Sequence, residues 1–121
     1  MGGYDLNPGT SIKLNSDFRR IYSRGKSAVS PCVVVYCRKN RLGTNRFGFT
    51  VSKKMGKAVV RNRVRRRLRE IMRLNSDRLE QGYDLILVAR THAIEAEYRS
   101  LEADVLRCCE RLQLMKKDVK A

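Results

Sequence analysis

Histidine is nearly absent from this sequence of 121 residues, in which His92 is the single example. There is also no Gly-x-Ser-x-Gly elbow, no phosphate-loop signature and no cluster of acidic residues at metal-binding spacing. Acid–base, nucleophilic and metal-assisted catalysis all depend on such groups. We therefore expect no catalytic residue and no metal held by protein side chains alone. If the chain belongs to an enzyme, another molecule is expected to hold the reacting atoms.

Long apolar runs are missing as well. No stretch approaches the length of a membrane-spanning helix, and no signal peptide is recognisable. Met1-Gly2 resembles the start of a myristoylation motif, but that motif requires Ser or Thr where Leu6 stands. The expected protein is soluble and cytoplasmic, and no membrane partner is expected.

Cysteine is present, but its spacing argues against metal binding and disulfides. Cys32 and Cys37 are expected on opposite faces of one strand, and Cys108 and Cys109 are adjacent on an apolar helix face. Neither spacing fits a zinc motif, and His92 has no partner ligand nearby in the sequence. Because buried free thiols behave as small hydrophobes, we predict four reduced, structural cysteines and no zinc.

Positive charge is what the sequence has in excess. It contains 27 Lys and Arg against 12 Asp and Glu, which gives a net charge of +15 and a pI near 10.4. This charge exceeds what solubility requires, whereas the apolar content of 42% is ordinary. A chain of this length makes about one domain. A nucleic acid is the expected partner.

The basic residues concentrate in residues 47–74. Alternating apolar residues predict a short half-buried strand at 47–52, and a small basic loop follows at 53–57. From Ala58 the period becomes helical, with an apolar stripe made by Val60, Val64, Leu68, Ile71 and Met72. Ten Lys or Arg and one acid, Glu70, lie between Lys53 and Arg73. Like charges weaken an isolated helix, so the pattern favours a polyanion against it, with Glu70 as a charge partner of its arginine neighbours.

The rest of the chain predicts one α+β domain. Asn15-Ser16-Asp17 can cap a helix that stops at Gly25, and strands are expected at 28–38 and 83–89. A turn-rich connection at 39–46 predicts that the first two strands form a hairpin. A helix is expected at 94–115. The order is α-β-β-α-β-α around a small mixed sheet, as a domain at 14–115 between an irregular arm at 1–13 and a charged tail at 116–121.

Several residues suit the binding of single-stranded nucleic acid. Ser52, Lys53, Lys54 and Gly56, with the N-terminus of the following helix, could form an anion site. A helical wheel places Arg61 and Arg67 at the borders of the apolar stripe, so Arg61 can reach toward the sheet. The same wheel points Asn62, Arg65, Arg66, Arg69 and Arg73 away from it. Phe18, Tyr22 and Tyr36 could stack bases, although core packing is the favoured interpretation of Phe18 and Tyr22.

One long motif resembles a known family. FGFTVSKKMGKAVVRNRVRRRLRE looks like the signature of the bacterial ribonuclease P protein subunit, with its strand, basic loop and RNR helix. The resemblance extends through LNSDFRRIYSRG, VVVYC and YDLILVAR, in compatible order over residues 14–113. An isolated RNR would be weak because arginine-rich helices are common.

The resemblance implies a fold and a function. The fold would be an αββαβα sandwich like a ribosomal-protein domain, with a left-handed β-α-β crossover against the general rule. The function would be 5′ maturation of precursor tRNA, in which a catalytic RNA with bound magnesium performs the hydrolysis. The residues implied to bind the catalytic RNA are Lys54, Arg61, Asn62, Arg63, Arg66 and Arg69. The residues implied to hold the single-stranded 5′ leader are Phe18, Tyr22, Val34, Tyr36, Thr50, Ser52, Lys53, Arg61 and Arg65.

The sequence departs from the family pattern at two places. Only Lys13 supplies charge just before the first helix, and Arg67 stands where an apolar residue is common, so its stem is expected to pack while its head reaches solvent. Three alternatives stay open: a ribosomal or general binder of structured RNA, a DNA-binding module, and a protein-only nuclease. Groove-reading DNA binders mix more Asn, Gln or Ser among their basic residues.

Overall fold

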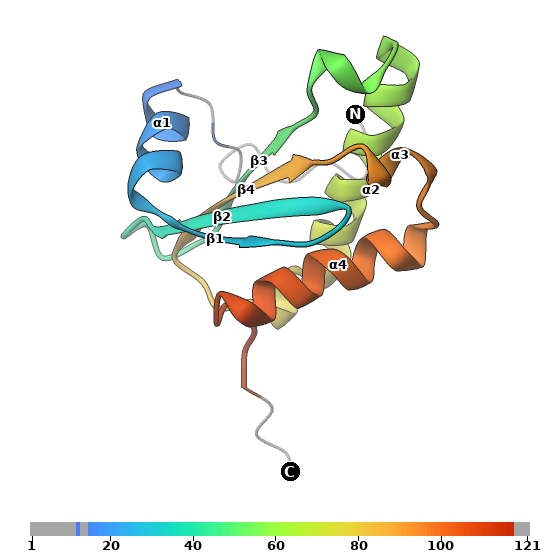
Figure 1. Ribbon diagram of the computed structural model, residues 1–121. Coiled ribbons are helices and arrows are strands. Elements are labelled where there is room, and N and C mark those ends of the chain that lie inside the picture. Colours follow the sequence, from blue (N-terminus) through green and yellow to red (C-terminus); the bar gives the residue numbers. More distant parts are fainter. Residues whose placement is uncertain (1–11, 13–14, 118–121) are drawn as a thin grey trace.

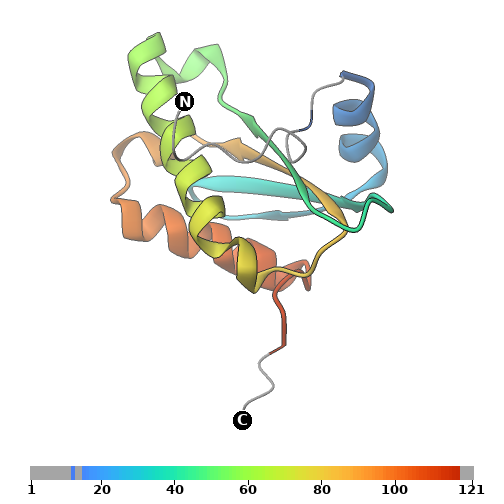
Figure 2. The same ribbon diagram turned by 180° about the vertical axis from the view of Figure 1, so that it is seen from behind.

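A computed structural model describes residues 12 and 15–117 (Figure 1). A four-stranded sheet carries two long helices on one face and one helix on the other, as the two opposite views show (Figures 1 and 2). The elements follow in the order α1 (Asn15–Arg24), β1 (Lys26–Val29), β2 (Val33–Lys39), β3 (Arg46–Thr50), η2 (Lys53–Met55), α2 (Ala58–Asn75), η3 (Ser76–Arg78), β4 (Tyr83–Ala89), α3 (His92–Glu95) and α4 (Tyr98–Arg111).

The sheet order corrects the predicted pairing of the first strands. The order is β1-β2-β4-β3, with β2 antiparallel to β4 and β3 parallel to β4. The expected hairpin between 28–38 and the strand at Phe47 is therefore wrong, since β4 lies between them. The reason is burial: Leu85, Ile86 and Leu87 are at most 1% exposed, so β4 needs neighbours on both sides and takes the centre.

Helix α2 makes the crossover connection between the parallel strands β3 and β4, as such strands require. It begins at Ala58, as predicted, and buries Val64, Leu68, Ile71 and Met72 against the sheet. The left-handed course of this crossover stays a prediction from the family resemblance.

A hairpin does form, but earlier in the chain than predicted. The segment expected as one strand at 28–38 is two strands, and β1 pairs with β2 in antiparallel register, with Val29 opposite Val34. Ser30 makes the turn: its backbone N–H and its hydroxyl both donate to the carbonyl of Val33, at 2.9 and 2.7 Å. Pro31 lies within this turn and removes no hydrogen bond from the sheet.

The helix predicted at 94–115 is broken and shorter. Ala96 is extended, with φ −69° and ψ 146°, so α3 ends at Glu95 and α4 begins at Tyr98. Helix α4 ends at Arg111 in a Schellman turn, because Gln113 is left-handed at φ 61° and the N–H of Leu114 donates to the carbonyl of Cys109 at 2.9 Å. Arrangements of this kind depend on tertiary contacts that helical periodicity does not register.

The chain ends are partly outside the described residues. The predicted irregular arm at 1–13 is described only at Ile12, which is buried and donates its N–H to the carbonyl of Phe47 at 3.0 Å. In the predicted charged tail, the N–H of Lys116 donates to the carbonyl of Arg78 at 2.8 Å, and residues 118–121 lie outside the description.

All four cysteines are buried free thiols, which confirms that they are reduced and structural. Burial raises the pKa of Cys109 to about 12. Burial and a hydrogen bond with the Asp104 carboxylate raise the pKa of Cys32 to about 11. The expectation that Cys32 and Cys37 lie on opposite faces of one strand is wrong: Cys32 precedes β2, and both side chains belong to the core under α2 and α4.

Candidate nucleic-acid interface

The sheet face under α1 carries a chain of three aromatic rings. The ring centroids of Phe18 and Tyr22 are 6.4 Å apart, and Tyr22 meets Tyr36 of β2 edge to face at 4.8 Å. Phe18 packs on a small core of Ile12, Ile21 and Ile86, whereas Tyr22 is 39% exposed. Core packing is therefore correct for Phe18, but Tyr22 presents its ring to solvent, as base stacking requires.

The sheet face beside these rings carries two apolar side chains and one hydroxyl. Thr50 and Val34 both register with Val88 of β4, so the three side chains share this face. All three are half-buried, and the Tyr22 hydroxyl lies 3.4 Å from Oγ1 of Thr50. The structure thus brings together five of the predicted leader residues beside α1 on one face of the sheet: Phe18, Tyr22, Val34, Tyr36 and Thr50.

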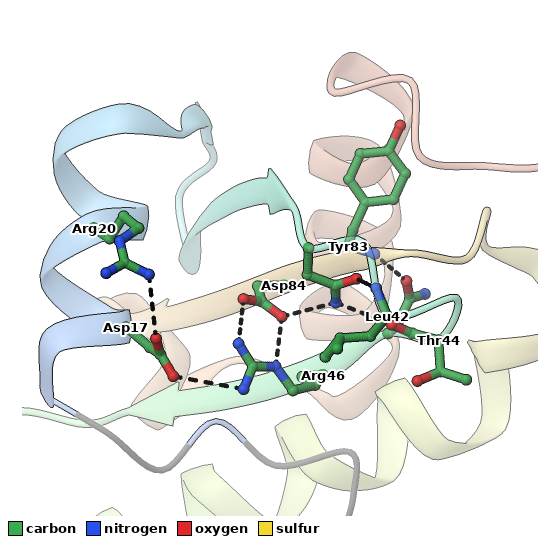
Figure 3. A network of polar contacts seen from close by, with 9 residues as sticks. Asp17, Arg20, Leu42, Thr44, Arg46, Tyr83 and Asp84 are labelled. Atoms are coloured by element: carbon green, nitrogen blue, oxygen red, sulfur yellow. Dashed lines mark hydrogen bonds and ion pairs between the residues drawn. The ribbon is translucent and has the colours of Figure 1, made fainter.

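An ion-pair network attaches α1 to one end of the sheet (Figure 3). Arg46 donates to both oxygens of the buried Asp84 carboxylate, at 2.8 and 2.6 Å, and reaches Asp17 of α1 at 3.5 Å. The hydrogen bond to Asp84 raises the pKa of the Arg46 guanidinium. Asn40 also donates to Asp84, at 2.9 Å. From the sequence, Asp17 is expected only as a helix-capping residue and Arg46, Asp84 and Asn40 have no expected role, although a lone acid in an apolar strand is a signal for a buried ion pair.

The predicted anion site forms one turn between β3 and α2. Ser52 caps η2, because its hydroxyl oxygen accepts the N–H of Lys54 at 3.1 Å, while Lys53 and Lys54 themselves are exposed. Gly56 has a φ of 134°, which side chains rarely adopt. The first turn of α2 has no side-chain cap and no acidic residue. Cations and backbone N–H groups therefore gather here, as an anion requires.

The arginines of α2 divide into rows that point in different directions. Arg61, Arg65 and Arg69 follow each other at helical spacing, and all are partly buried. The Arg61 Nε donates to the carbonyl of Gly56 at 3.1 Å, and the Arg65 Nη1 donates to Asn62 Oδ1 at 2.9 Å. The outer residues Asn62, Arg63 and Arg66 are exposed.

The predicted direction of Arg69 is wrong. Its guanidinium carbon lies 5.6 Å from the centre of the Phe49 ring of β3, a cation–π contact at the sheet edge. The helical wheel placed Arg69 on the outer face because it used an ideal 100° step and ignored the reach of a long side chain. Arg69 therefore belongs to the row beside β3.

Two further predictions about α2 have different outcomes. Glu70 pairs with Arg73 at 2.7 Å, which confirms its part as a charge partner. Arg67 packs its stem as expected, but its head does not reach solvent: the Nη2 donates to the carbonyl of Ala96 at 3.0 Å and the Nη1 is buried. Burial lowers the pKa of Arg67. This side chain joins α2 to the break between α3 and α4.

The described part of the chain holds neither a cluster of metal ligands nor a membrane-spanning helix. Among residues 12 and 15–117, no three His, Cys, Asp or Glu side chains gather in a group that could hold a metal ion. In the same residues, no helix has both the length and the apolar character to cross a membrane.

These features define a class of protein first. It is a small α+β domain with three neighbouring aromatic rings on one sheet face and an arginine-rich crossover helix on the other. Comparison with known proteins identifies its family. The family model for Ribonuclease P matches residues 6–113. The ribonuclease P protein component of Alkaliphilus oremlandii is 41% identical over 104 residues, covering 86% of this chain and 91% of the relative.

Other relatives agree with this match. The ribonuclease P protein component of Clostridium botulinum strain Loch Maree is 43% identical over 101 residues, 83% of this chain and 91% of the relative. The structure of Staphylococcus aureus RNase P protein has a TM-score of 0.81 at 30% identity and covers 88% of this chain and 98% of its own. The Thermotoga maritima RNase P protein has a TM-score of 0.75 at 31% identity, and the match covers 80% of this chain and 92% of the Thermotoga chain. The chain belongs to the ribonuclease P protein family.

Proposed function

We propose that this chain binds the 5′ leader of precursor tRNA in its aromatic cleft and the catalytic RNA of ribonuclease P through α2. Family membership makes it a component of an endoribonuclease of tRNA processing and a partner of the RNase P RNA. The observation that carries the finer proposal is the exposed Tyr22 ring, set edge to face against Tyr36 of β2.

The cleft suits a single strand because it offers rings without base-reading groups. Each stacked base contributes about 1–3 kcal/mol and every base has a π-face, so such a cleft binds varied leader sequences. The leader exists only in the precursor. A protein that binds it therefore favours precursor over mature tRNA and releases the product more readily.

The exposed residues of α2 and its loop suit a structured RNA. Lys54, Asn62, Arg63 and Arg66 are exposed and point away from the domain. Guanidinium forks match phosphate oxygens in pairs. Arg61, Arg65 and Arg69 are partly buried and Arg69 lies beside Phe49 of β3, so we assign this row, with Ser52 and Lys53, to the border between leader and catalytic RNA.

Screening of phosphates gives the protein its effect on the reaction. A net charge of +15 between two RNAs reduces their repulsion, so the complex requires less magnesium to become compact. In this proposal, the RNA and its phosphates hold magnesium and supply the hydrolysis. The protein is expected to lower the apparent dissociation constant of the substrate and the magnesium requirement more than it changes the chemical step.

Cleavage of a 5′-extended precursor tRNA at low magnesium tests the proposal. The reactions contain catalytic RNA with and without the protein, and the protein alone. The arm with protein alone matters because a mutant of the Staphylococcus aureus relative is described as defective in mRNA degradation activity. Stimulation only when both components are present supports the proposal. Cleavage by the protein alone overturns it, and no effect in any combination returns the chain to general RNA binding.

A further inference from the structure

A cavity is lined by residues from the ends of β1, β2 and β4 and from the C-terminal end of α4. Figure 1 shows these ends of the strands and of the helix on the same side of the domain. The volume of the cavity is about 290 Å³. Cys37, Tyr83 and Leu112 are its buried or half-buried apolar residues. The residues that line it are Arg24, Gly25, Lys26, Cys37, Arg38, Lys39, Tyr83, Leu112 and Gln113.

Strand register explains why cations surround an apolar centre. Lys26 is opposite Cys37 and Lys39 is opposite Tyr83, so each lysine is the cross-strand partner of an apolar residue of the cavity. These residues share the sheet face that α4 covers. The helix ends here because Gln113 is left-handed, which leaves Leu112 and Gln113 as a wall in place of a further helical turn.

The cavity has one sign of charge. Of the residues that line it, four are cations and none is acidic. Arg24, Lys26, Arg38 and Lys39 make no ion pair or side-chain hydrogen bond with another described residue. Four neighbouring cations that have no counterion among residues 12 and 15–117 favour an anionic ligand.

Two neighbouring depressions extend the basic surface. One, of about 240 Å³, is bordered by Arg20, Arg38, Lys39 and Arg41, and its acids Asp17 and Asp84 are already paired with Arg46. The other is lined by Arg38, Lys39, Arg41, Gln81 and Gly82. Arg38 and Lys39 border all three hollows. The cations thus form a continuous path away from the cavity, at the end of β2 remote from the α2 N-terminus (Figure 1).

We propose that this cavity takes one unstacked RNA nucleotide, with its base against Tyr83 and its flanking phosphates on Lys26 and Lys39. An aromatic ring among cations is the combination that binds a single nucleotide of an RNA strand. Ligand cavities begin near about 300 Å³, so the space suits one nucleotide and excludes a duplex. The inference rests on the proposed function only in taking RNA as the partner, and it adds a site separate from the leader cleft and α2.

The test measures binding by the full chain with two matched charge variants. Lys26→Ala with Lys39→Ala removes two cations of the cavity. Arg99→Ala with Lys117→Ala removes two exposed cations elsewhere, so the net charge is the same. The probes are the ribonuclease P catalytic RNA alone and a 5′-extended precursor tRNA added to the assembled complex. The first variant is expected to bind one of these two RNAs more weakly than the second variant does, by on the order of 10-fold. The slope of its log affinity against log salt concentration is expected to be smaller by about 1.4.

A stacking variant and a cross-link give independent readouts. Tyr83→Leu keeps an apolar side chain but removes the ring. It is expected to lower the affinity for the same RNA about 5-fold or more. Irradiation of RNA containing 4-thiouridine is expected to attach a nucleotide to the peptide that carries Tyr83. The RNA in that adduct identifies whether catalytic RNA or precursor tRNA supplies the nucleotide.

The outcomes separate this inference from the proposed function. Equal affinities of the two charge variants, together with no adduct at Tyr83, overturn the inference even when the wild-type protein stimulates leader-dependent cleavage. Loss of leader dependence in the wild type overturns the proposed function, whereas a cavity-specific defect in binding catalytic RNA still supports the nucleotide site. Thermal unfolding of each variant identifies any that is not folded, and the cross-link to the wild-type chain needs no variant.

Discussion

The ring of Phe18 lies directly on the backbone of Gly48: a β-carbon at position 48 would stand 2.7 Å from Cζ of the ring. Gly48 is buried and registers with Ile86 at the centre of the small core under α1. This contact sets how closely α1 approaches the sheet. It therefore sets the width of the aromatic cleft, because Tyr22 lies one helical turn after Phe18.

Gly48→Ala is expected to destabilise the protein by about 1–3 kcal/mol, as overpacking of a core does. It should also weaken binding of a leader by displacing α1. Urea unfolding and leader-dependent affinity measure the two effects. Adding Phe18→Leu should restore part of the stability by making room. Equal stability of Gly48→Ala and the wild type would show that α1 moves without cost.

Asp84→Asn tests the network that attaches α1 to the sheet. Asn has nearly the shape of Asp, but it carries no charge and only one acceptor oxygen, so Arg46 loses one of its two hydrogen bonds to position 84 and keeps only the longer ion pair with Asp17. Because the Arg46 side chain is 21% exposed, water offsets part of the cost, and a loss of about 1–3 kcal/mol in the free energy of unfolding is expected. Asp17→Asn is the matched control at 3.5 Å and should cost less.

Tyr36→Ala is expected to weaken binding of precursor tRNA by about 1–3 kcal/mol and to leave binding of mature tRNA unchanged. The reason is that only the leader is proposed to reach this ring. Arg61→Ala should likewise reduce the leader-dependent part of the affinity. Tyr98→Phe, a change on the opposite side of the sheet, serves as the control. Leader-dependent affinity that survives both Tyr36→Ala and Arg61→Ala contradicts the proposed cleft.

Thiol ionisation predicts a loss of stability at alkaline pH. The pKa of Cys109 is raised from 9.0 to about 12 in the folded protein, so the unfolded chain loses this proton first. The contribution of the protonated Cys109 thiol to the free energy of unfolding is fully present below about pH 9 and is lost as the pH rises from there toward 12. Between these values, the free energy of unfolding of Cys109→Ala should fall with pH less steeply than that of the wild type, by up to about 1.4 kcal/mol per pH unit. Parallel curves in urea unfolding between pH 8 and 10.5 would contradict this.

Gln113→Gly is expected to stabilise the protein by about 0.5–1 kcal/mol. Gln113 has a φ of 61° in the Schellman turn, a conformation that glycine adopts without the strain of a β-carbon. Thermal or urea unfolding measures the change. Gln113→Ala, which keeps the β-carbon, should give no such gain, and equal effects of the two variants would show that the side chain itself matters.

Much of the secondary structure follows from local pattern. Helix α1 lies where its cap and stop residues predict, α2 begins at the predicted Ala58, and β4 spans the predicted 83–89. The physical reason is that the period of apolar side chains and the preferences of turn residues act over a few residues. The aromatic and basic residues of the interface were likewise visible, because their chemistry does not depend on what they contact.

The pairing of strands and the break between α3 and α4 depend on the tertiary structure. The sequence predicts a hairpin between 28–38 and the strand at Phe47, whereas the observed hairpin joins β1 to β2. A strand with two apolar faces specifies burial but not which neighbours provide it, and here β4 lies between β2 and β3. No proline or glycine in the sequence marks the break at Ala96. The Ala96 carbonyl accepts a hydrogen bond from Arg67 of α2.

The same division holds for the site. Sequence alone determined that the chain is a basic α+β domain of the ribonuclease P protein family type, with its arginines on one helix, because composition, period and motif are local properties. Tertiary structure decided which rings are exposed, that Arg69 turns to Phe49, and that Asp84 holds Arg46. These depend on distances between residues far apart in the chain, which packing of the whole domain sets.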